Sequence, residues 1–232
     1  MFKFLCLLLL PAFCYGQNSF PGVERLKAAA IPAEIKIRGK IEDAWKWTDK
    51  LGENILVTAV LGPYKDKSKV IDGETNNVEL FAAHYVKTDS GYRVRWRMND
   101  FVKDCELDLV CHFMREAFKV TDLDNNGIAE TKLQYKMVCH GDVSPPYMKL
   151  IMHEDSIKYA LRGEMWVIGA SEDTVFRVTE KNVNLEKFPA KEDDYTWVMG
   201  RYETEKDFVR APQQFLIFAR KEWLKFAKET FE

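Results

Sequence analysis

The stretch Asp122-Leu-Asp-Asn-Asn-Gly-Ile-Ala-Glu130 lies between two apolar segments near the middle of the chain. Oxygen-bearing side chains recur along it, and a glycine stands where the chain must turn sharply. A hard cation such as Ca2+ takes about six to eight oxygen ligands at about 2.3–2.6 Å, and clustered carboxylates repel one another unless a cation neutralises them. The pattern predicts a structural calcium site, with side-chain ligands Asp122, Asp124, Asn126 and Glu130, a carbonyl ligand from Ile128, and the turn at Gly127.

The segments beside this loop favour strands over the helices of an EF-hand. The twelfth position of the loop, where an EF-hand has a bidentate glutamate, is Leu133. Leu133, Tyr135 and Met137 alternate with polar residues, which is the periodicity of a strand. The loop therefore resembles the strand-joining loops of FG-GAP and related calcium-loop β repeats, with Glu130 as the closing carboxylate. A polar turn without metal is the alternative, because Asp, Asn and Gly also dominate ordinary tight turns.

The N-terminal residues 1–16 have the pattern of a signal peptide. Lys3 precedes an apolar core, and Cys14-Tyr-Gly16 places a small residue at the cleavage point. We therefore expect an exported protein of the periplasm, the medium or the cell surface. The apolar core is too short to span a bilayer as a helix, and we expect no transmembrane segment after it. A net charge of −2 gives no reason to expect nucleic acid as a partner.

Three cysteines, Cys105, Cys111 and Cys139, follow the signal peptide, and export makes a disulfide permissible. We expect a Cys105–Cys139 bridge across the region of the loop. The Cys111–Cys139 pairing is an alternative that the sequence leaves open. The pairs Cys111-His112 and Cys139-His140 also raise zinc, but their spacing fits no common structural zinc pattern.

Alternating and apolar runs predict an α+β fold rich in β-structure, with mostly antiparallel sheets built from hairpins. The content of hydrophobic residues is 47%, which is ample for a packed core. The clearest hairpin spans residues 78–98, where Tyr92, Val94, Trp96 and Met98 alternate with polar residues. The predicted strands are residues 35–47, 54–61, 78–86, 92–98, 147–153 and 157–163, with further short strands at 165–169 and 174–178.

The remaining segments complete the expected domain of residues 35–232. Residues 17–34 are expected to form a loose leader, and residues 62–77 and 179–194 to form charged loops. Leu109, Phe113 and Ala117 stand at helical spacing and predict a short helix over 107–117. A C-terminal helix over 212–231 begins near Pro212 and presents an aromatic stripe to the sheet, made of Phe215, Phe218, Trp223 and Phe226.

Two stretches resemble a known family. They are Val120-Thr-Asp-Leu-Asp-Asn-Asn-Gly-Ile-Ala-Glu130 and Lys136-Met-Val-Cys-His-Gly-Asp-Val-Ser-Pro145, the second leading into Met148-Lys-Leu-Ile-Met152 and Lys158-Tyr-Ala-Leu-Arg-Gly163. They are similar to exported bacterial envelope proteins labelled surface-polysaccharide biosynthesis proteins, best over residues 75–165. The resemblance implies an envelope location and surface glycan or envelope proteins as partners. It implies no catalytic residues.

The functional expectation is a non-catalytic exported domain stabilised by calcium and connected with surface glycan or envelope assembly. The alternative is an enzyme that acts on polysaccharide through paired carboxylates. His153-Glu-Asp155 could hold an acid or base, but these residues fall at an expected hairpin tip, where charged residues are commonly only solvated. Trp45 and Trp47 could stack on sugar if exposed, although core packing is the simpler expectation.

Overall fold

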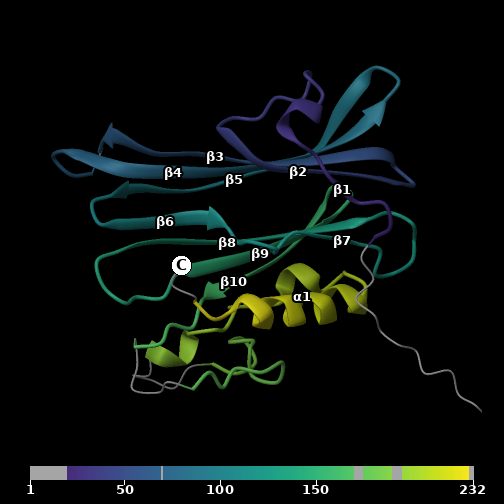
Figure 1. Ribbon diagram of the computed structural model, residues 1–232. Helices are drawn as coiled ribbons and strands as arrows, with labels where there is room; N and C mark the ends of the chain where they lie inside the picture. Colours follow the sequence, from purple (N-terminus) through teal and green to yellow (C-terminus); the bar gives the residue numbers. More distant parts are fainter. Residues whose placement is uncertain (1–19, 69, 170–174, 190–194, 230–232) are drawn as a thin grey trace, which may run out of the picture.

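The computed structural model describes residues 20–229 except residues 69, 170–174 and 190–194. Two antiparallel sheets are stacked on each other, and one helix covers the far side of the second sheet (Figure 1). The predicted β-rich α+β class is confirmed. We call the sheet that begins with β1 sheet A and the sheet that contains the loop 122–130 sheet B.

Sheet A follows the chain from hairpin to hairpin. Its strands are β1 (Glu24–Arg25), β2 (Lys40–Asp49), β3 (Gly52–Lys67), β4 (Glu74–Thr88) and β5 (Gly91–Cys105), in that spatial order. The hairpin predicted over 78–98 is confirmed as β4–β5. The loop predicted over 62–77 is wrong for most of its length, because β3 and β4 stay paired out to Lys67 and Glu74. The register shifts between Leu61 and Tyr64, so the Gly62-Pro63 interruption makes an irregularity in the ladder and does not end it.

Sheet B has the order β10-β9-β8-β6. The short β7 also pairs with β8, along the stretch of β8 that precedes the part paired with β6. Its strands are β6 (Asp108–Phe113), β7 (Lys119–Thr121), β8 (Glu130–His140), β9 (Tyr147–Glu154) and β10 (Ile157–Glu164). Strands therefore flank the loop on both sides, as predicted, and the β9–β10 hairpin is also confirmed. The helix predicted over 107–117 is wrong. Leu109, Phe113 and Ala117 are four residues apart, and this spacing fits two strand repeats as well as one helical turn.

The inner faces of the two sheets form the main core. Its fully buried members include Trp47, Leu56, Leu80 and Leu133, and Trp45 packs at its margin. Trp47 is 1% exposed, and Trp45 stacks on Phe118 with 3.8 Å between the ring centroids. Both tryptophans therefore serve packing, which removes them as a platform for sugar.

The segment predicted as a loose leader is packed on sheet A where the structure describes it. Leu26, Ile31 and Ile35 cover the outer face of sheet A, over Ala83 and Tyr85. The segment contributes β1 and the short 3-10 helix η1 (Ala28–Ala30). At its start the N–H of Phe20 donates to the carbonyl of Val120, 2.9 Å away, just before the loop. Residues 17–19 and the expected signal peptide lie outside the described residues.

Helix α1 (Gln213–Phe226) docks on the outer face of sheet B, as the aromatic stripe predicted. Phe215, Ala219 and Trp223 are completely buried there. The helix is shorter than the expected 212–231. It ends because the carbonyl of Ala227 accepts a hydrogen bond from the N–H of Trp166 at 2.7 Å, which turns the chain into an extended path.

A buried ion pair also joins α1 to sheet B. Lys132 on β8 points to the face opposite Leu133, and it is 1% exposed beneath the helix. Its Nζ is 2.6 Å from Oε2 of Glu222 and 2.7 Å from the carbonyl oxygen of Ala117. Burial is the main cause that lowers the pKa of Lys132 to about 8, against the attraction of Glu222. Both faces of β8 are therefore buried from Glu130 to Lys136.

The segment between β10 and α1 is largely irregular. Residues 165–169 and 175–178, where short strands were expected, contain no strand; Trp166 forms only an isolated bridge to Lys228. Residue 174 lies outside the described residues. The described part of the expected surface loop, residues 179–189, turns inward, because Val183 is fully buried and Asn184 is bridged to Tyr202. Residues 190–194 lie outside the described residues. The short 3-10 helices η2 (Tyr195–Val198) and η3 (Lys206–Phe208) lie farther along the same segment.

Cys105 and Cys139 form a disulfide with 5.7 Å between their Cα atoms, and Cys111 is a buried free thiol. The expected pairing is confirmed over the Cys111–Cys139 alternative. The bridge joins the end of β5 in sheet A to β8 in sheet B. With Cys139 engaged in this way, the two Cys-His pairs do not form a zinc site.

His84 is a buried titratable group in the core between the sheets. It stacks on Trp47 with 5.2 Å between ring centroids. Its Nε2 is 2.9 Å from Oδ1 of Asn54. That oxygen only accepts, so Nε2 carries the hydrogen and Nδ1 remains bare, with no partner among the described residues. Burial is the main cause that lowers the pKa of His84 to about 4.

Acid should destabilise the fold through His84. Its pKa of about 6.5 in the unfolded chain lies above its folded pKa of about 4, so the unfolded state binds more protons and stability falls as the pH drops through this range. Between pH 6.5 and 5.5 this loss should be about 1 kcal/mol. Urea unfolding curves recorded across this pH range should show this loss of stability in the wild type, and His84→Gln should lack it. The same pH slope in both proteins would contradict the assignment.

Candidate metal centre

The loop 122–130 joins β7 to β8 as a connection between paired strands. Thr121 and Glu130 are opposite each other in the ladder, so the loop starts and ends at one place. Single oxygen atoms from Asp122, Asp124 and Glu130 lie within 4.8 Å of one another. The structure thus brings together the three carboxylates that the sequence singled out, in a cluster that could hold a metal ion.

The loop backbone has the turn that the sequence predicted. Gly127 has a φ of 80°, in the left-handed region that glycine adopts readily. Its N–H donates to Oδ2 of Asp122 at 3.1 Å, and the N–H of Asn126 donates to Oδ1 of Asp124 at 3.1 Å. One oxygen of each aspartate therefore holds the loop in shape. The other oxygen of Asp122 is left for a different partner, whereas the other oxygen of Asp124 accepts from the side chain of Asn126 at 3.1 Å.

Two carboxylate oxygens in the cluster are buried and have no hydrogen-bond partner among the described residues: Oδ1 of Asp122 and Oε1 of Glu130. The second oxygen of Glu130 accepts hydrogen bonds from the hydroxyl of Thr121 at 2.7 Å and from the N–H of Leu123 at 3.0 Å. Glu130 is 1% exposed, so water cannot readily solvate the remaining oxygen. A buried, unsatisfied carboxylate oxygen is costly, and a bound cation would remove that cost.

The environment of Glu130 opposes its negative charge. Burial is the largest cause, and together with the charges of Asp124 and Glu154 it raises the pKa of Glu130 to about 7, against the hydrogen bonds that lower it. Near neutral pH, a substantial fraction of Glu130 is therefore protonated when no cation is present. A divalent cation would compete with that proton.

Glu154 is a fourth carboxylate that the sequence reasoning did not assign to this cluster. It ends β9 and stands opposite Glu130 in the ladder. The amide nitrogen of Asn126 donates to Glu154 at 2.5 Å and to Asp124 at 3.1 Å. Burial raises the pKa of Glu154, and the charges of Asp124 and Asp122 add to the effect. No spacing in the sequence reveals Glu154, because only the β8–β9 register places it there.

The side chain of Asn126 differs in orientation from that of an oxygen ligand. Its nitrogen faces the carboxylates, while its Oδ1 accepts the N–H of Ile128 at 2.7 Å. A half-turn about the last side-chain torsion would exchange the two atoms and offer oxygen to a cation. Ligation by the carbonyl of Ile128 stays a prediction.

The β2–β3 turn of sheet A holds the loop from the other side. The N–H of Lys50 donates to the carbonyl of Gly127 at 2.9 Å, and the N–H of Ala129 donates to Oδ2 of Asp49 at 3.0 Å. The ammonium of Lys50 also donates to the carbonyl of Asn126. The candidate centre therefore lies where the two sheets are joined, and the shape of the loop depends on sheet A.

Asp49→Ala should destabilise the protein by about 2 kcal/mol, because several donors lose their acceptor together. Besides Ala129, Asp49 accepts from the N–H of Leu51 at 2.8 Å and from the side chain of Asn54 at 2.9 Å. Chemical unfolding checks the loss. Asp66→Ala is a suitable control, since Asp66 is exposed on β3 and, within the described part of the chain, bonds only the adjacent Lys67 N–H; equal losses would contradict the role of Asp49.

The other residues of the β9–β10 turn have structural partners. His153 is buried and stacks on Trp96 with 4.0 Å between the ring centroids. Asp155 forms an ion pair with Arg95 of β5. The expected solvated hairpin tip is therefore a second connection between the sheets, and Glu154 is the member of this turn that faces the candidate metal centre.

Comparisons with protein-family models, with curated proteins and with solved structures give no match for this chain. Among the described residues, the structure has no helix of sufficient length and apolarity to cross a membrane.

Proposed function

We propose that this chain is a non-catalytic, exported β-sandwich module that binds Ca2+ in the loop 122–130. The observation that carries the proposal is the pair of buried, unpartnered oxygens, Asp122 Oδ1 and Glu130 Oε1, beside Asp124. Asp122, Asp124 and Glu130 would hold the cation, Glu154 stands next to them, and Asn126 and Ile128 would add neutral oxygens. A donor set made only of oxygens suits Ca2+ or Mg2+ better than zinc or copper.

The bound cation would stabilise the joint between the two sheets. It would hold together β7, β8 and the end of β9, which carry the carboxylates. Asp49 and Lys50 of sheet A form hydrogen bonds with the backbone of the same loop, so an ordered loop also supports this contact between the sheets. A site of this charge would match extracellular modules, which bind Ca2+ at about 10⁻⁴–10⁻³ M.

A role with surface glycan or envelope proteins forms the second part of the proposal. It is supported by the resemblance of residues 120–130 and 136–163 to exported envelope proteins. Glycan binding with and without Ca2+ tests this part separately from metal binding. Retention of a surface polysaccharide by the immobilised protein in Ca2+ supports it. No retention of any polysaccharide in either condition would leave the metal site standing and remove the glycan role.

The alternative of a polysaccharide-cleaving enzyme finds less support in the geometry. Glycoside hydrolysis needs two carboxylates across the scissile bond. A hollow in the described part of the chain lies beside β6, and Glu229, which is paired with Lys136, is the one carboxylate that lines it. The clustered acids of the loop instead lie close together, as ligands for one cation would.

Thermal unfolding in Ca2+, in Mg2+ and in a chelator tests the metal site directly. With a dissociation constant of about 10⁻⁴ M, Ca2+ at about 10 mM should stabilise the fold by about 2.7 kcal/mol, and a chelator should reverse the gain. Mg2+ should give a smaller shift, because it demands nearly ideal octahedral geometry. An equal Tm in all three conditions would overturn the proposal.

A further inference from the structure

The edge strands of the two sheets differ in how they are protected from pairing with another chain. In sheet A, β1 is only two residues long, and β5 carries exposed Arg93, Arg97 and Lys103. In sheet B, the edge of β10 is bridged from Gly163 to Tyr202. Short edge strands, charged side chains and covering segments all prevent another chain from pairing. Strand β6 has less protection: it pairs only with β8 among the described residues, its one acidic residue is Asp108 at its start, and it contains no Lys, Arg or Pro.

The hydrogen-bonding direction along β6 follows from one contact. The N–H of Met114 donates to the carbonyl of Gln134 at 2.9 Å, and the β6–β8 register has no shift. Because the direction alternates along an antiparallel strand, His112 and Val110 bond to β8. The backbone groups of Leu109, Cys111 and Phe113 consequently face outward. The carbonyl of Phe113 accepts from Nδ1 of His112 at 3.0 Å, and the other outward groups have no described partner.

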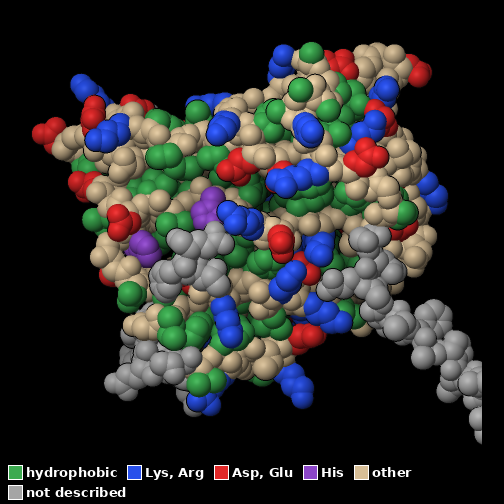
Figure 2. All heavy atoms as spheres, viewed as in Figure 1, with side chains coloured by type: hydrophobic (Ala, Val, Ile, Leu, Met, Phe, Trp, Pro, Cys, Tyr) green, Lys and Arg blue, Asp and Glu red, His purple; other side chains and the backbone are tan. Residues whose placement is uncertain are grey.

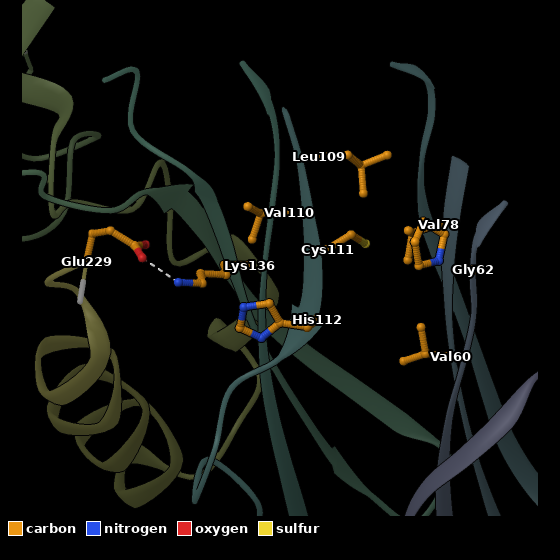
Figure 3. Close-up of a pocket in the computed structure, with 10 residues that line it drawn as sticks. Val60, Gly62, Val78, Leu109, Val110, Cys111, His112, Lys136 and Glu229 are labelled. Carbon is orange, nitrogen blue, oxygen red and sulfur yellow. Dashed lines mark hydrogen bonds and ion pairs between the residues drawn. The ribbon is translucent and has the colours of Figure 1, made fainter. Parts of the chain in front are cut away.

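A hollow of about 380 Å³ lies along this edge and reaches both faces of β6. Towards sheet A, Leu109 and Cys111 point at Val60 and Val78 (Figure 3). On the opposite face of the strand lie His112, Lys136 and Glu229 (Figure 3). Figure 2 shows hydrophobic side chains in the band between the two sheets, with histidine beside them. One flank of the edge is therefore apolar and the other polar.

The polar flank offers hydrogen-bond acceptors. Glu229 forms an ion pair with Lys136 through Oε1, while its Oε2 is buried without a partner, in a side chain that is 6% exposed. Nδ1 of His112 donates to a carbonyl, so Nε2 of the neutral ring is an acceptor. The unpartnered oxygen of Glu229 and Nε2 of His112 make this flank favour hydrogen-bond donors such as an ammonium group.

We propose that the outer edge of β6 binds an extended segment of another protein, which adds as the next strand of sheet B. Main-chain bonds to Leu109, Cys111 and Phe113 would give the affinity, and side chains on alternate sides would give the specificity. The apolar flank selects valine-sized residues towards Val60 and Val78. The acceptor flank selects lysine towards Glu229 and His112. The segment that fits this edge is a strand in which small apolar residues alternate with lysine.

The probe is the peptide acetyl-Lys-Val-Lys-Val-Lys-Val-amide, added to the protein labelled with ¹⁵N. Binding should slow amide hydrogen exchange at Leu109, Cys111 and Phe113, while the exchange of residues on β5 should not change. No protection at these three amides at saturating peptide would overturn the proposal. Protection at β5 instead would place the site on the wrong sheet and overturn it as well.

Backbone methylation separates strand pairing from simple filling of the hollow. In an extended peptide all valine N–H groups point to one side and all lysine N–H groups to the other. N-methylation of the set that faces β6 should weaken binding by about tenfold or more, and methylation of the other set should not. Equal binding by both methylated peptides would show that backbone pairing is not used and would overturn the proposal.

Charge and self-association provide two further controls. The peptide with Glu in place of Lys should bind more weakly, and Glu229→Gln should reduce the preference for lysine, whereas the exposed Glu106→Gln should not. If Glu229→Gln keeps the same preference for lysine and the same Tm as the wild type, the role of the acceptor flank is contradicted.

Sedimentation velocity without peptide should show no association through β6. A dimer that the peptide dissociates would assign this edge to a second copy of the chain instead.

Discussion

Glu130→Gln should abolish the calcium-induced rise in Tm while leaving the calcium-free protein at least as stable as the wild type above pH 7. The wild type should gain about 2.7 kcal/mol at a calcium concentration about 100 times the dissociation constant, which is a rise of about 5–10 °C for a protein of this size. In the variant, an amide replaces the buried carboxylate that would ligate the cation. Differential scanning calorimetry with Ca2+ and with a chelator measures both effects.

The pH dependence gives this prediction a definite sign. The pKa of Glu130 is raised to about 7 from an ordinary value of 4.5, so the metal-free fold binds the extra proton and loses stability as the pH rises through 7. Glu130→Gln removes this loss, and calcium offsets it in the wild type. Calcium affinity should therefore weaken as the pH falls below about 7, because the proton competes with the cation.

The exposed Glu106→Gln is the matched control and should keep the full calcium response. Binding calorimetry at pH 6 and pH 8 then checks the competition with the proton. A calcium response that survives in Glu130→Gln would show that the cation binds elsewhere. A loss of folding in the variant, even without calcium, would contradict the view that the Glu130 charge is unfavourable in the metal-free fold.

Lys132→Met should destabilise the protein by about 3–5 kcal/mol, because it leaves Glu222 buried without its partner. Glu222 is 3% exposed under α1, and Lys132 also donates to the carbonyl of Ala117. The loss is a large part of the stability of about 5–15 kcal/mol that is typical of a domain. Urea unfolding, followed by tryptophan fluorescence, measures it.

The double variant Lys132→Met/Glu222→Leu should recover most of this loss, since a well-packed apolar pair of similar volume is often as stable as a buried ion pair. Lys221→Met, on the exposed face of the same helix, should change stability by about 0.5 kcal/mol or less. If the double variant were less stable than Lys132→Met alone, the unpaired carboxylate would not be the cause.

Local patterns in the sequence were sufficient for the β-rich class, the 78–98 hairpin, the strands beside the loop and the docked C-terminal helix. Each rests on a periodicity that only one element type satisfies, as in the strict alternation from Tyr92 to Met98. The β6 segment was different, because Leu109, Phe113 and Ala117 satisfy the helical and the strand repeat together. The partner strand β8 decides between the two repeats, and the local sequence does not contain that information.

The candidate centre shows the same division between local and distant information. Asp122, Asp124, Gly127 and Glu130 stand in one loop, so their spacing already indicates a common purpose. Glu154 joins them only through the pairing of β8 with β9. The burial of Lys132 was missed for a related reason: alternation separates the two faces of a strand but does not tell which faces are covered.

The bond between Phe20 and Val120 has a practical consequence for preparing the protein. It fixes the start of the described chain two residues from the first carboxylate of the loop, while Glu229 at the other end of the described chain lines the hollow along β6. A polyhistidine purification handle left ahead of Phe20 would bring imidazoles, which bind divalent metals, next to the centre under test. A handle after Glu229 would crowd the strand edge instead. Cation titrations therefore call for a C-terminal tag and peptide titrations for an N-terminal tag, or both for protein from which the tag has been removed.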